Sequence, residues 1–205
     1  MPIALHVYFA FVATTLLIMS VPDASKMLIL SRSASGGASA GLVTLIGVKV
    51  AEAVQVILVS IGLSWLIVAY PSIFEGVTLI GAIYLVYVGI KTWQADNKQS
   101  RQAKRRGSDF LTGFSISLAN PKTIIFLGTL FPHFLNHAAP LDIQFALLGT
   151  TFLVIATLLD TPLVIGGGLV ERLIHSPQIL DWLKRLNSGV LLVAGVFLMG
   201  LFIFK

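Results

Sequence analysis

Two long apolar segments of this chain are each interrupted by a proline that lies beside a charged residue. Residues 20–23 read Ser-Val-Pro-Asp, and residues 119–122 read Ala-Asn-Pro-Lys. Proline removes a backbone N–H donor and clashes with the carbonyl one turn earlier, so a helix breaks there and leaves polar groups without partners. In hydrocarbon those groups must find partners within the protein. Breaks at corresponding places in two halves of a membrane protein are typical of a transporter binding site.

The composition identifies the class of protein. Apolar residues make up 56% of the chain, charged residues only 11%, and the mean hydropathy is +0.92. A chain of 205 residues has room for roughly six or seven membrane-spanning helices of about 20 residues each. We therefore expect an all-α integral membrane protein with a single transmembrane domain, residues 1–205. The chain has no cysteine, which excludes disulfides, thiolate metal ligands and thiol electron carriers.

Six transmembrane helices are expected, and the first and fourth of them are broken at Pro22 and Pro121. Pro132 is expected to end the fourth helix. The first apolar run lacks a basic region before it and a small-residue cleavage site after it, so we interpret it as a retained helix and not as a signal peptide. The expected spans cover about residues 3–21, 41–69, 73–93, 110–131, 143–163 and 186–204.

Basic residues gather in alternate connections between these spans. They lie after the first span (Lys26, Arg32), the third (Lys98, Arg101, Lys104, Arg105, Arg106) and the fifth (Arg172, Lys184, Arg185). Because positive residues stay on the cytoplasmic side, this pattern predicts a bacterial inner (plasma) membrane protein with both termini on the outer, periplasmic side. A basic run can also bind lipid headgroups or nucleic acid. We interpret this one mainly as an orientation signal and expect no nucleic-acid partner.

The two halves of the chain correspond weakly in sequence. Aligning Pro22 with Pro121 also aligns Phe11 with Phe110, and it places Asp23 opposite Lys122. Three spans in each half would insert in opposite senses and form inverted-topology repeats, which support alternating access. Coincidence of two proline-containing helices is the alternative. The expected units are repeat one at about 1–93, a basic cytoplasmic loop at about 94–109, and repeat two at about 110–205.

Two charged residues fall inside the second span. A lone charge at the middle of the bilayer costs roughly 2.5 to 3.5 kcal/mol on insertion scales. Lys49 and Glu52 are three residues apart, so they share a helix face and can pair, and Gln55 lies further along the same face. The pair either neutralises itself as a structural contact or takes part in substrate or proton handling, and the sequence leaves both open.

A third charge, Asp160, lies in the fifth span between Thr157 and the Thr-Pro step at 161–162, with no basic residue nearby in sequence. A buried carboxylate without a partner tends to take up a proton, which suits a proton-coupled carrier. The alternative is a structural tie in which Asp160 pairs with Lys122 or Lys49 across the bundle.

The polar groups at the two breaks form the expected binding site. Freed amides and nearby side chains there can bind a carboxylate or an ammonium group. Tyr84 shares a face of the third span with Tyr87, which suits either a cavity lining or ordinary packing. The expected substrate-binding residues are Pro22, Asp23, Asn120, Pro121, Lys122 and Tyr84.

Metal and cofactor chemistry is not expected. His133 and His137 have the four-residue spacing of metal ligands, but Asp142 is the only carboxylate near them in sequence, so we interpret them as loop residues. No spacing of Ser, His and Asp suggests a hydrolase either, so we do not expect an enzyme.

Several runs of residues together resemble the LysE/RhtB family of amino-acid exporters. The resemblance covers about two thirds of the chain, from the first span to the end of the fourth. It is carried by Pro22-Asp23, residues 27–33 (MLILSRS), Gly37, residues 40–42 (AGL), Gly47, residues 61–63 (IGL), 79–85 (LIGAIYL), 89–91 (GIK), 113–114 (GF), 118–122 (LANPK) and 131–134 (FPHF).

The resemblance implies export of amino acids or related small metabolites from the cytoplasm, driven by the proton-motive force as proton antiport and without ATP. Asp160 or Glu52 would then carry the coupling proton. The family usually shows Pro-Gly-Pro at the first break, where this chain has Ser-Val-Pro, and a common glycine of the second span is Ala51 here. We therefore expect a stiffer first break and a divergent member. The alternative is a cation (metal ion) transporter of the same plan, in which Asp23, Glu52 and Asp160 would gather round the metal ion. A homodimer is left open.

Overall fold

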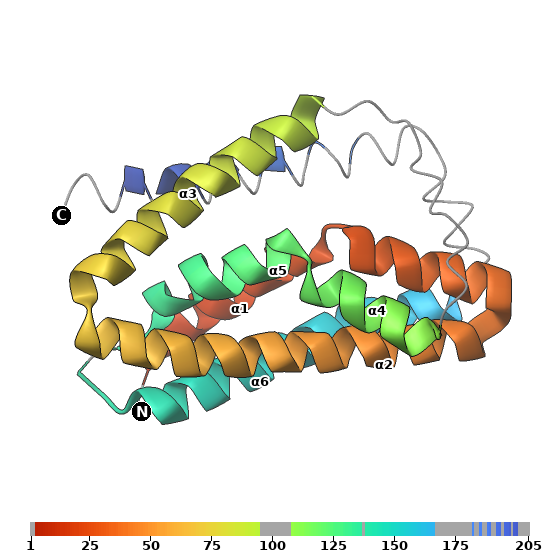
Figure 1. The fold of residues 1–205 in the computed structure, drawn as a ribbon, viewed down its shortest axis with the longest axis horizontal. Helices are drawn as coiled ribbons and strands as arrows, with labels where there is room; N and C mark the ends of the chain where they lie inside the picture. The colour runs from red at the N-terminus through yellow and green to blue at the C-terminus, as the bar shows by residue number, and fades with distance from the viewer. Residues whose placement is uncertain are drawn as a thin grey trace.

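The computed structural model describes residues 3–94, 108–136 and 138–166, together with residues 182, 185, 188, 189, 192, 193, 195–197, 199 and 200. Within this part every regular element is a helix or helical turn, which confirms the all-α class (Figure 1). In chain order the elements are α1 (Leu5–Ser20), α2 (Ala24–Ala69), α3 (Pro71–Gln94), α4 (Asp109–Leu118), α5 (Pro121–Ile125), the π-helical turn η1 (Phe126–Leu130), the 3-10 turn η2 (Phe131–Phe134) and α6 (Leu141–Ile165).

Helix α2 folds back on itself at Gly37, whose φ of 77° and ψ of 178° lie in a region open essentially only to glycine. Its first arm, residues 24–36, continues beyond the end of α1. Its second arm, residues 38–69, returns along the length of the bundle (Figure 1). Thus the chain reverses its direction at Gly37, and the second arm runs opposite to α1 and the first arm (Figure 1).

The expected loop after the first span is in fact the helical first arm of α2, which corrects the interpretation of Lys26 and Arg32 as loop residues. The helix restarts because a carboxylate oxygen of Asp23 accepts the backbone N–H of Lys26 at 3.1 Å, as helix N-caps do. Lys26 is buried, and Arg32 pairs with Asp109 at 3.2 Å. Lys26 is therefore not an orientation signal. Residues 95–107 and 167–181, which hold most of the other counted charges, lie outside the described part.

The second break separates α4 from α5, and the two parts meet at an angle of 44°. The helical path continues through η1 and η2 to Phe134, past the expected end at Pro132. Pro132 lies in the first turn of η2, where a missing N–H costs little, so this proline does not end the segment.

Within the described residues, two helical stretches are long and apolar enough to cross a membrane, and the bent pair α4 and α5–η2 makes a third candidate. The two are Ala24–Gly62 and Leu141–Ile165, while Leu5–Ser20 and Leu79–Lys91 are shorter apolar helices. Most of the expected sixth span, 186–204, lies outside the described residues. The six-span inverted repeat therefore stays a prediction.

Helix α4 packs closely against the second arm of α2, because a glycine on each helix faces the backbone of the other helix. A Cβ on Gly47 would overlap the carbonyl of Phe110, and one on Gly113 would overlap the carbonyl of Thr44. Small residues allow such close approach of helices in membranes. The apolar core lies among α1, η1, η2 and α6, with the rings of Phe11, Phe126, Phe131 and Phe152 at its centre.

Candidate functional site

The two proline breaks, distant in sequence, meet in the structure. The side-chain amide of Asn120 donates to a carboxylate oxygen of Asp23 at 3.0 Å. The ammonium of Lys122 donates to the carbonyl of Val21 at 2.6 Å and lies 3.4 Å from the same Asp23 oxygen. The structure therefore brings together the predicted site residues that follow and flank Pro22 and Pro121.

Polar backbone groups freed at the second break are satisfied by side chains. Asn120 caps α5, because its side-chain oxygen accepts the N–H of Lys122 at 3.1 Å. The amide nitrogen of Gln55 donates to the carbonyls of Ser117 and Leu118, both at 3.1 Å, where α4 ends. Since Gln55 belongs to α2, the first half of the chain satisfies the break in the second.

The converse holds at the first break, where Lys122 supplies the donor for the carbonyl of Val21. Each break carries a side-chain cap, Asp23 directly after its proline and Asn120 directly before its proline. The sequence alignment places Asp23 opposite Lys122, so it does not pair these two caps.

A second cluster of charges lies around Asp160 of α6. One of its oxygens contacts the ammonium of Lys26, and the other accepts from Lys49 at 2.6 Å. Lys49 also binds Glu52 at 2.8 Å. The expected Lys49–Glu52 pair and the expected tie between Asp160 and Lys49 are both present. The expectation of an unpaired Asp160 is wrong, because Asp160 pairs with Lys26 and Lys49. Both lysines are distant from Asp160 in sequence.

Lys26 is the site residue that sequence reasoning missed, since it was counted as a loop charge. The available signal was its position three residues after Asp23, on the helix that the first break starts. Its backbone N–H binds Asp23 while its ammonium binds Asp160, so it joins the two clusters. Across both clusters the ion pairs match the lysines 26, 49 and 122 with the carboxylates of Asp23, Glu52 and Asp160. The mutual pairing offsets the cost of burying each charge.

Tyr84 is not brought to the breaks. It lies on α3 with 41% of its surface exposed, and the centre of its ring lies 6.0 Å from the centre of the Tyr87 ring. His133 contacts the carbonyl of Thr129 at 2.9 Å, while His137 lies outside the described residues. In the part of the chain that the structure describes, no three His, Cys, Asp or Glu residues are placed to hold a metal ion. The described ion pairs of Asp23, Glu52 and Asp160 are all with lysines, and Asp23 also accepts from the Asn120 amide and the Lys26 backbone N–H, which gives no support to the cation alternative.

Comparison with known protein families identifies the kind of protein. The sequence profile described as LysE type translocator matches residues 16–200. The chain belongs to the LysE type translocator family. It is a membrane transporter and not an enzyme.

Relatives of this translocator match it over nearly their whole length. A protein of Salmonella typhimurium named homoserine/homoserine lactone efflux protein is 26% identical over 195 residues, 93% of this chain and 95% of its own. A protein of the same name from Salmonella typhi has the same identity and coverage. A Vibrio cholerae protein described only as an uncharacterized membrane protein is 28% identical over 203 residues, 95% of this chain and 97% of its own. No solved structure matches significantly.

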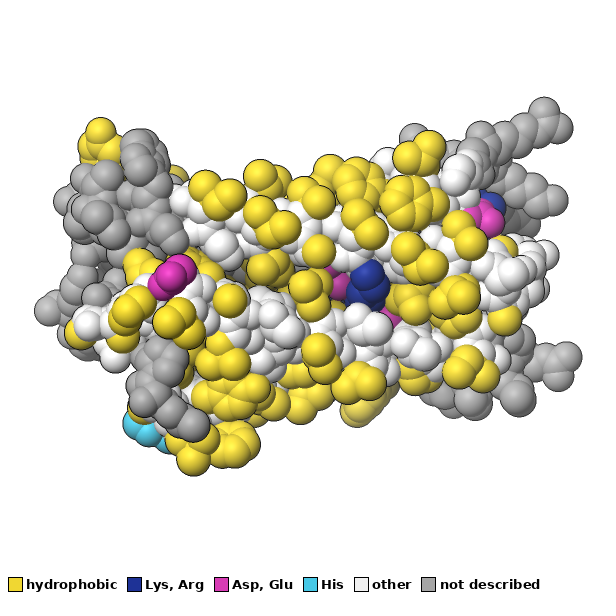
Figure 2. Space-filling view, turned by 90° about the horizontal axis from the view of Figure 1, so that it is seen from below, with side chains coloured by type: hydrophobic (Ala, Val, Ile, Leu, Met, Phe, Trp, Pro, Cys, Tyr) yellow, Lys and Arg dark blue, Asp and Glu magenta, His cyan; other side chains and the backbone are white. Residues whose placement is uncertain are grey.

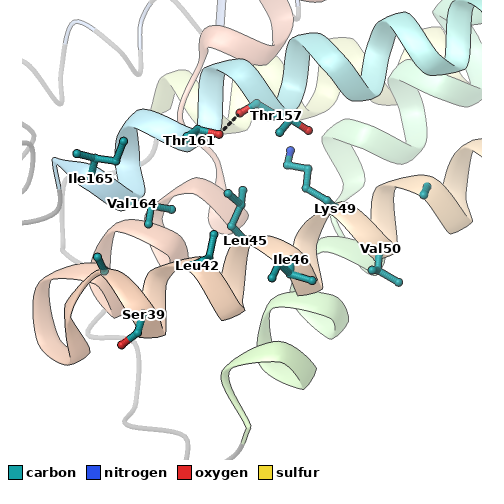
Figure 3. A pocket seen from close by; sticks show the side chains of 12 residues that line it. Ser39, Leu42, Leu45, Ile46, Lys49, Val50, Thr157, Thr161, Val164 and Ile165 are labelled. Atoms are coloured by element: carbon teal, nitrogen blue, oxygen red, sulfur yellow. Dashed lines mark hydrogen bonds between the residues drawn. The ribbon is translucent and has the colours of Figure 1, made fainter.

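The translocator also has a groove of about 780 Å³ between the second arm of α2 and α6. Its walls are mainly apolar, and the ammonium of Lys49 points across it toward Thr157 and Thr161 (Figure 3). Figure 2 shows a basic side chain with acidic ones beside it, surrounded by apolar side chains, on one face of the molecule. Because Lys49 lines the groove and also pairs with Glu52 and Asp160, it belongs to both the groove and the charge cluster.

Proposed function

We propose that this translocator exports amino acids, or closely related small metabolites, out of the cytoplasm across a bacterial inner membrane. The single observation that carries the proposal is the Asp23–Lys122 ion pair at the junction of the two breaks. Homoserine efflux, named for the Salmonella relatives, supports this class of substrate. The family membership supports transport across a membrane.

The charges of the Asp23–Lys122 ion pair are complementary to those of a zwitterionic amino acid. Its separation of 3.4 Å is longer than the other polar contacts of Asp23, at 3.0 and 3.1 Å. An amino acid carries a carboxylate that Lys122 can bind and an ammonium that Asp23 can bind. Inserting the substrate replaces one ion pair by two and keeps the charges balanced, so the substrate offsets the desolvation cost of separating the protein's own pair.

Alternating access would follow from separating and rejoining the breaks. In Figure 1, α1 with the first arm of α2 runs opposite to α4 with α5, as inverted repeats require. A few hydrogen bonds and one ion pair join the breaks. Each of these contacts connects the first half of the chain to the second half. A substrate bound between them would compete for these contacts and shift the equilibrium between two arrangements.

For proton antiport we propose Glu52 as the proton carrier. Asp160 contacts two ammonium groups, whereas the described ion pair of Glu52 is with Lys49 alone. Protonating Glu52 therefore gives up fewer ionic contacts than protonating Asp160. Lys49 would then bind Asp160 alone, so a proton on Glu52 changes the cluster that Lys26 connects to the first break.

The test uses the purified full chain in proteoliposomes, with homoserine as the labelled substrate. Asp23→Asn and Lys122→Met should each lower homoserine counterflow at least about tenfold, the equivalent of losing roughly 1.4 kcal/mol of binding. Asp142→Asn is the matched control, because this acid lies in the first turn of α6, away from both breaks. Unchanged counterflow in both site variants would place the substrate elsewhere.

Counterflow needs no proton gradient, so it separates binding from coupling. Glu52→Gln should retain counterflow but lose the dependence of efflux on an imposed pH gradient, while Asp160→Asn should lower both through loss of structure. Efflux by Glu52→Gln that still follows the pH gradient would exclude Glu52 as the proton carrier.

A further inference from the structure

The groove between α2 and α6 has apolar walls and one strong donor. Thr157 and Thr161 use their hydroxyl protons on carbonyls of their own helix, at 2.6 and 2.8 Å. Ser39 also lines the groove, but at the end away from Lys49, so Lys49 supplies the charged donor at its own end of the groove (Figure 3). The larger apolar side chains of the lining are Leu42, Leu45, Ile46, Val50, Val164 and Ile165.

Lys49 has donor capacity that its own cluster does not use. An ammonium carries three N–H donors, and the described acceptors of Lys49 are Glu52 at 2.8 Å and Asp160 at 2.6 Å. The side chain of Lys49 keeps 16% of its surface exposed, more than the 3% of Asp160. A donor that faces hydrocarbon without an acceptor is costly, so an acceptor in the groove would be stabilising.

The charge balance selects the kind of acceptor. Lys26 and Lys49 already neutralise Glu52 and Asp160. An anionic head would add an uncompensated negative charge in a low-dielectric setting, and a cationic head would be repelled by Lys49. An uncharged acceptor, such as an amide or ester carbonyl, satisfies the donor without disturbing the balance.

The expected depth of Lys49 argues against a phospholipid headgroup as the occupant. At 1.5 Å per residue, Lys49 lies about 12 Å along the helix from the expected start of the second span at about residue 41. Half of the hydrocarbon core is about 15 Å thick. On these bounds a group that reaches Lys49 lies deep in the hydrocarbon and belongs to a molecule dissolved there.

We propose that the α2/α6 groove is a second, membrane-facing binding site for an uncharged amphiphile, in which a carbonyl accepts from Lys49 and a short aliphatic chain lies along the apolar walls. The ligand enters sideways from the bilayer. This site is separate from the paired breaks and does not depend on the substrate bound there.

Photolabelling of the full chain in phosphatidylcholine nanodiscs tests the site, with a diazirine derivative of decanamide as the probe. Label is expected within residues 38–53 and 157–165. Unlabelled decanamide should compete at least about tenfold better than decane, decanoate or decylamine. Ile46→Trp, which fills the groove from its wall, should abolish the label, whereas Ile83→Trp on α3 is the control because Ile83 is similarly exposed outside the groove, 51% against 48%.

Lys49→Met supplies a second test that leaves the walls in place. In this variant decanamide should compete no better than decane. Equal competition by decane and decanamide in the unsubstituted protein would overturn the proposal, as would label that survives Ile46→Trp. Displacement of the probe by a photoreactive phosphatidylcholine as effectively as by decanamide would also overturn it, because a bilayer lipid would then be the occupant.

Discussion

The side-chain amide of Asn120 binds the carboxylate of Asp23 at 3.0 Å, although the two residues are 97 positions apart. Each residue is also the N-cap of the half-helix that follows its own break. The contact therefore joins the starts of two half-helices directly. Neither break is an independent local defect, and movement of one changes the caps of the other.

We predict strong coupling between Asp23 and Lys122. Asp23→Asn keeps a side-chain oxygen for the cap but leaves the ammonium of Lys122 without its counter-charge. Breaking a buried pair in this way costs roughly 3–5 kcal/mol. The double variant Asp23→Asn/Lys122→Met should recover part of that loss, as measured by thermal unfolding in detergent. Additive losses would show that the pair contributes no coupling energy.

Lys49→Met should lower the melting temperature more than Lys26→Met. Removing Lys49 takes a partner from both Glu52 and Asp160, whereas Asp160 keeps Lys49 when Lys26 is removed. Methionine retains most of the apolar stem, so the comparison reports mainly the charge. A smaller loss for Lys49→Met would mean that Lys26 is the main partner of Asp160.

Gly47→Ala should destabilise the packing of α2 against α4. The added Cβ meets the backbone carbonyl of Phe110, which has little freedom to move. Overpacking of this kind costs typically about 1–3 kcal/mol. Gly62→Ala on the same helix is the control, because nothing lies within 4 Å of the added atom there. Equal melting temperatures for the two variants would contradict the close contact.

Gly37→Ala should also destabilise the protein, but for a different reason. A Cβ at this position meets nothing within 4 Å, so the cost arises from the backbone angles alone. Such strain amounts to about 1–3 kcal/mol. Gly37→Asn should fare no better, since the ψ of 178° lies outside the left-handed helical region that asparagine tolerates. Thermal unfolding of both variants checks this, and full stability of either would exclude the fold-back geometry.

The parts of the site that could be predicted are those that depend on neighbours in sequence. Proline chemistry is local, so Pro22 and Pro121 indicated both breaks. The spacing of Lys49 and Glu52 on one helix face indicated their pair. Pro132 was misinterpreted because a proline destabilises a helix in its interior but costs little in a first turn, and Pro132 lies in the first turn of η2.

The contacts that assemble the site could not be predicted in the same way. Lys26 and Asp160 are 134 residues apart, and no local pattern pairs them. Gln55 binds the carbonyls at the end of α4 only because the two helices pack closely through Gly47 and Gly113. Such pairings depend on the path of the whole chain.

Composition and proline placement were sufficient to indicate a helical membrane protein with two broken helices, because hydrophobicity and backbone chemistry act over a few residues at a time. Tertiary structure alone showed that the breaks face each other, that the caps Asp23 and Asn120 contact each other, and that Lys26 is a buried ion-pair partner and not a loop charge. The physical reason is that a buried charge or a freed backbone group is stabilised by whichever partner the fold brings near. In this translocator most of those partners come from the other half of the chain.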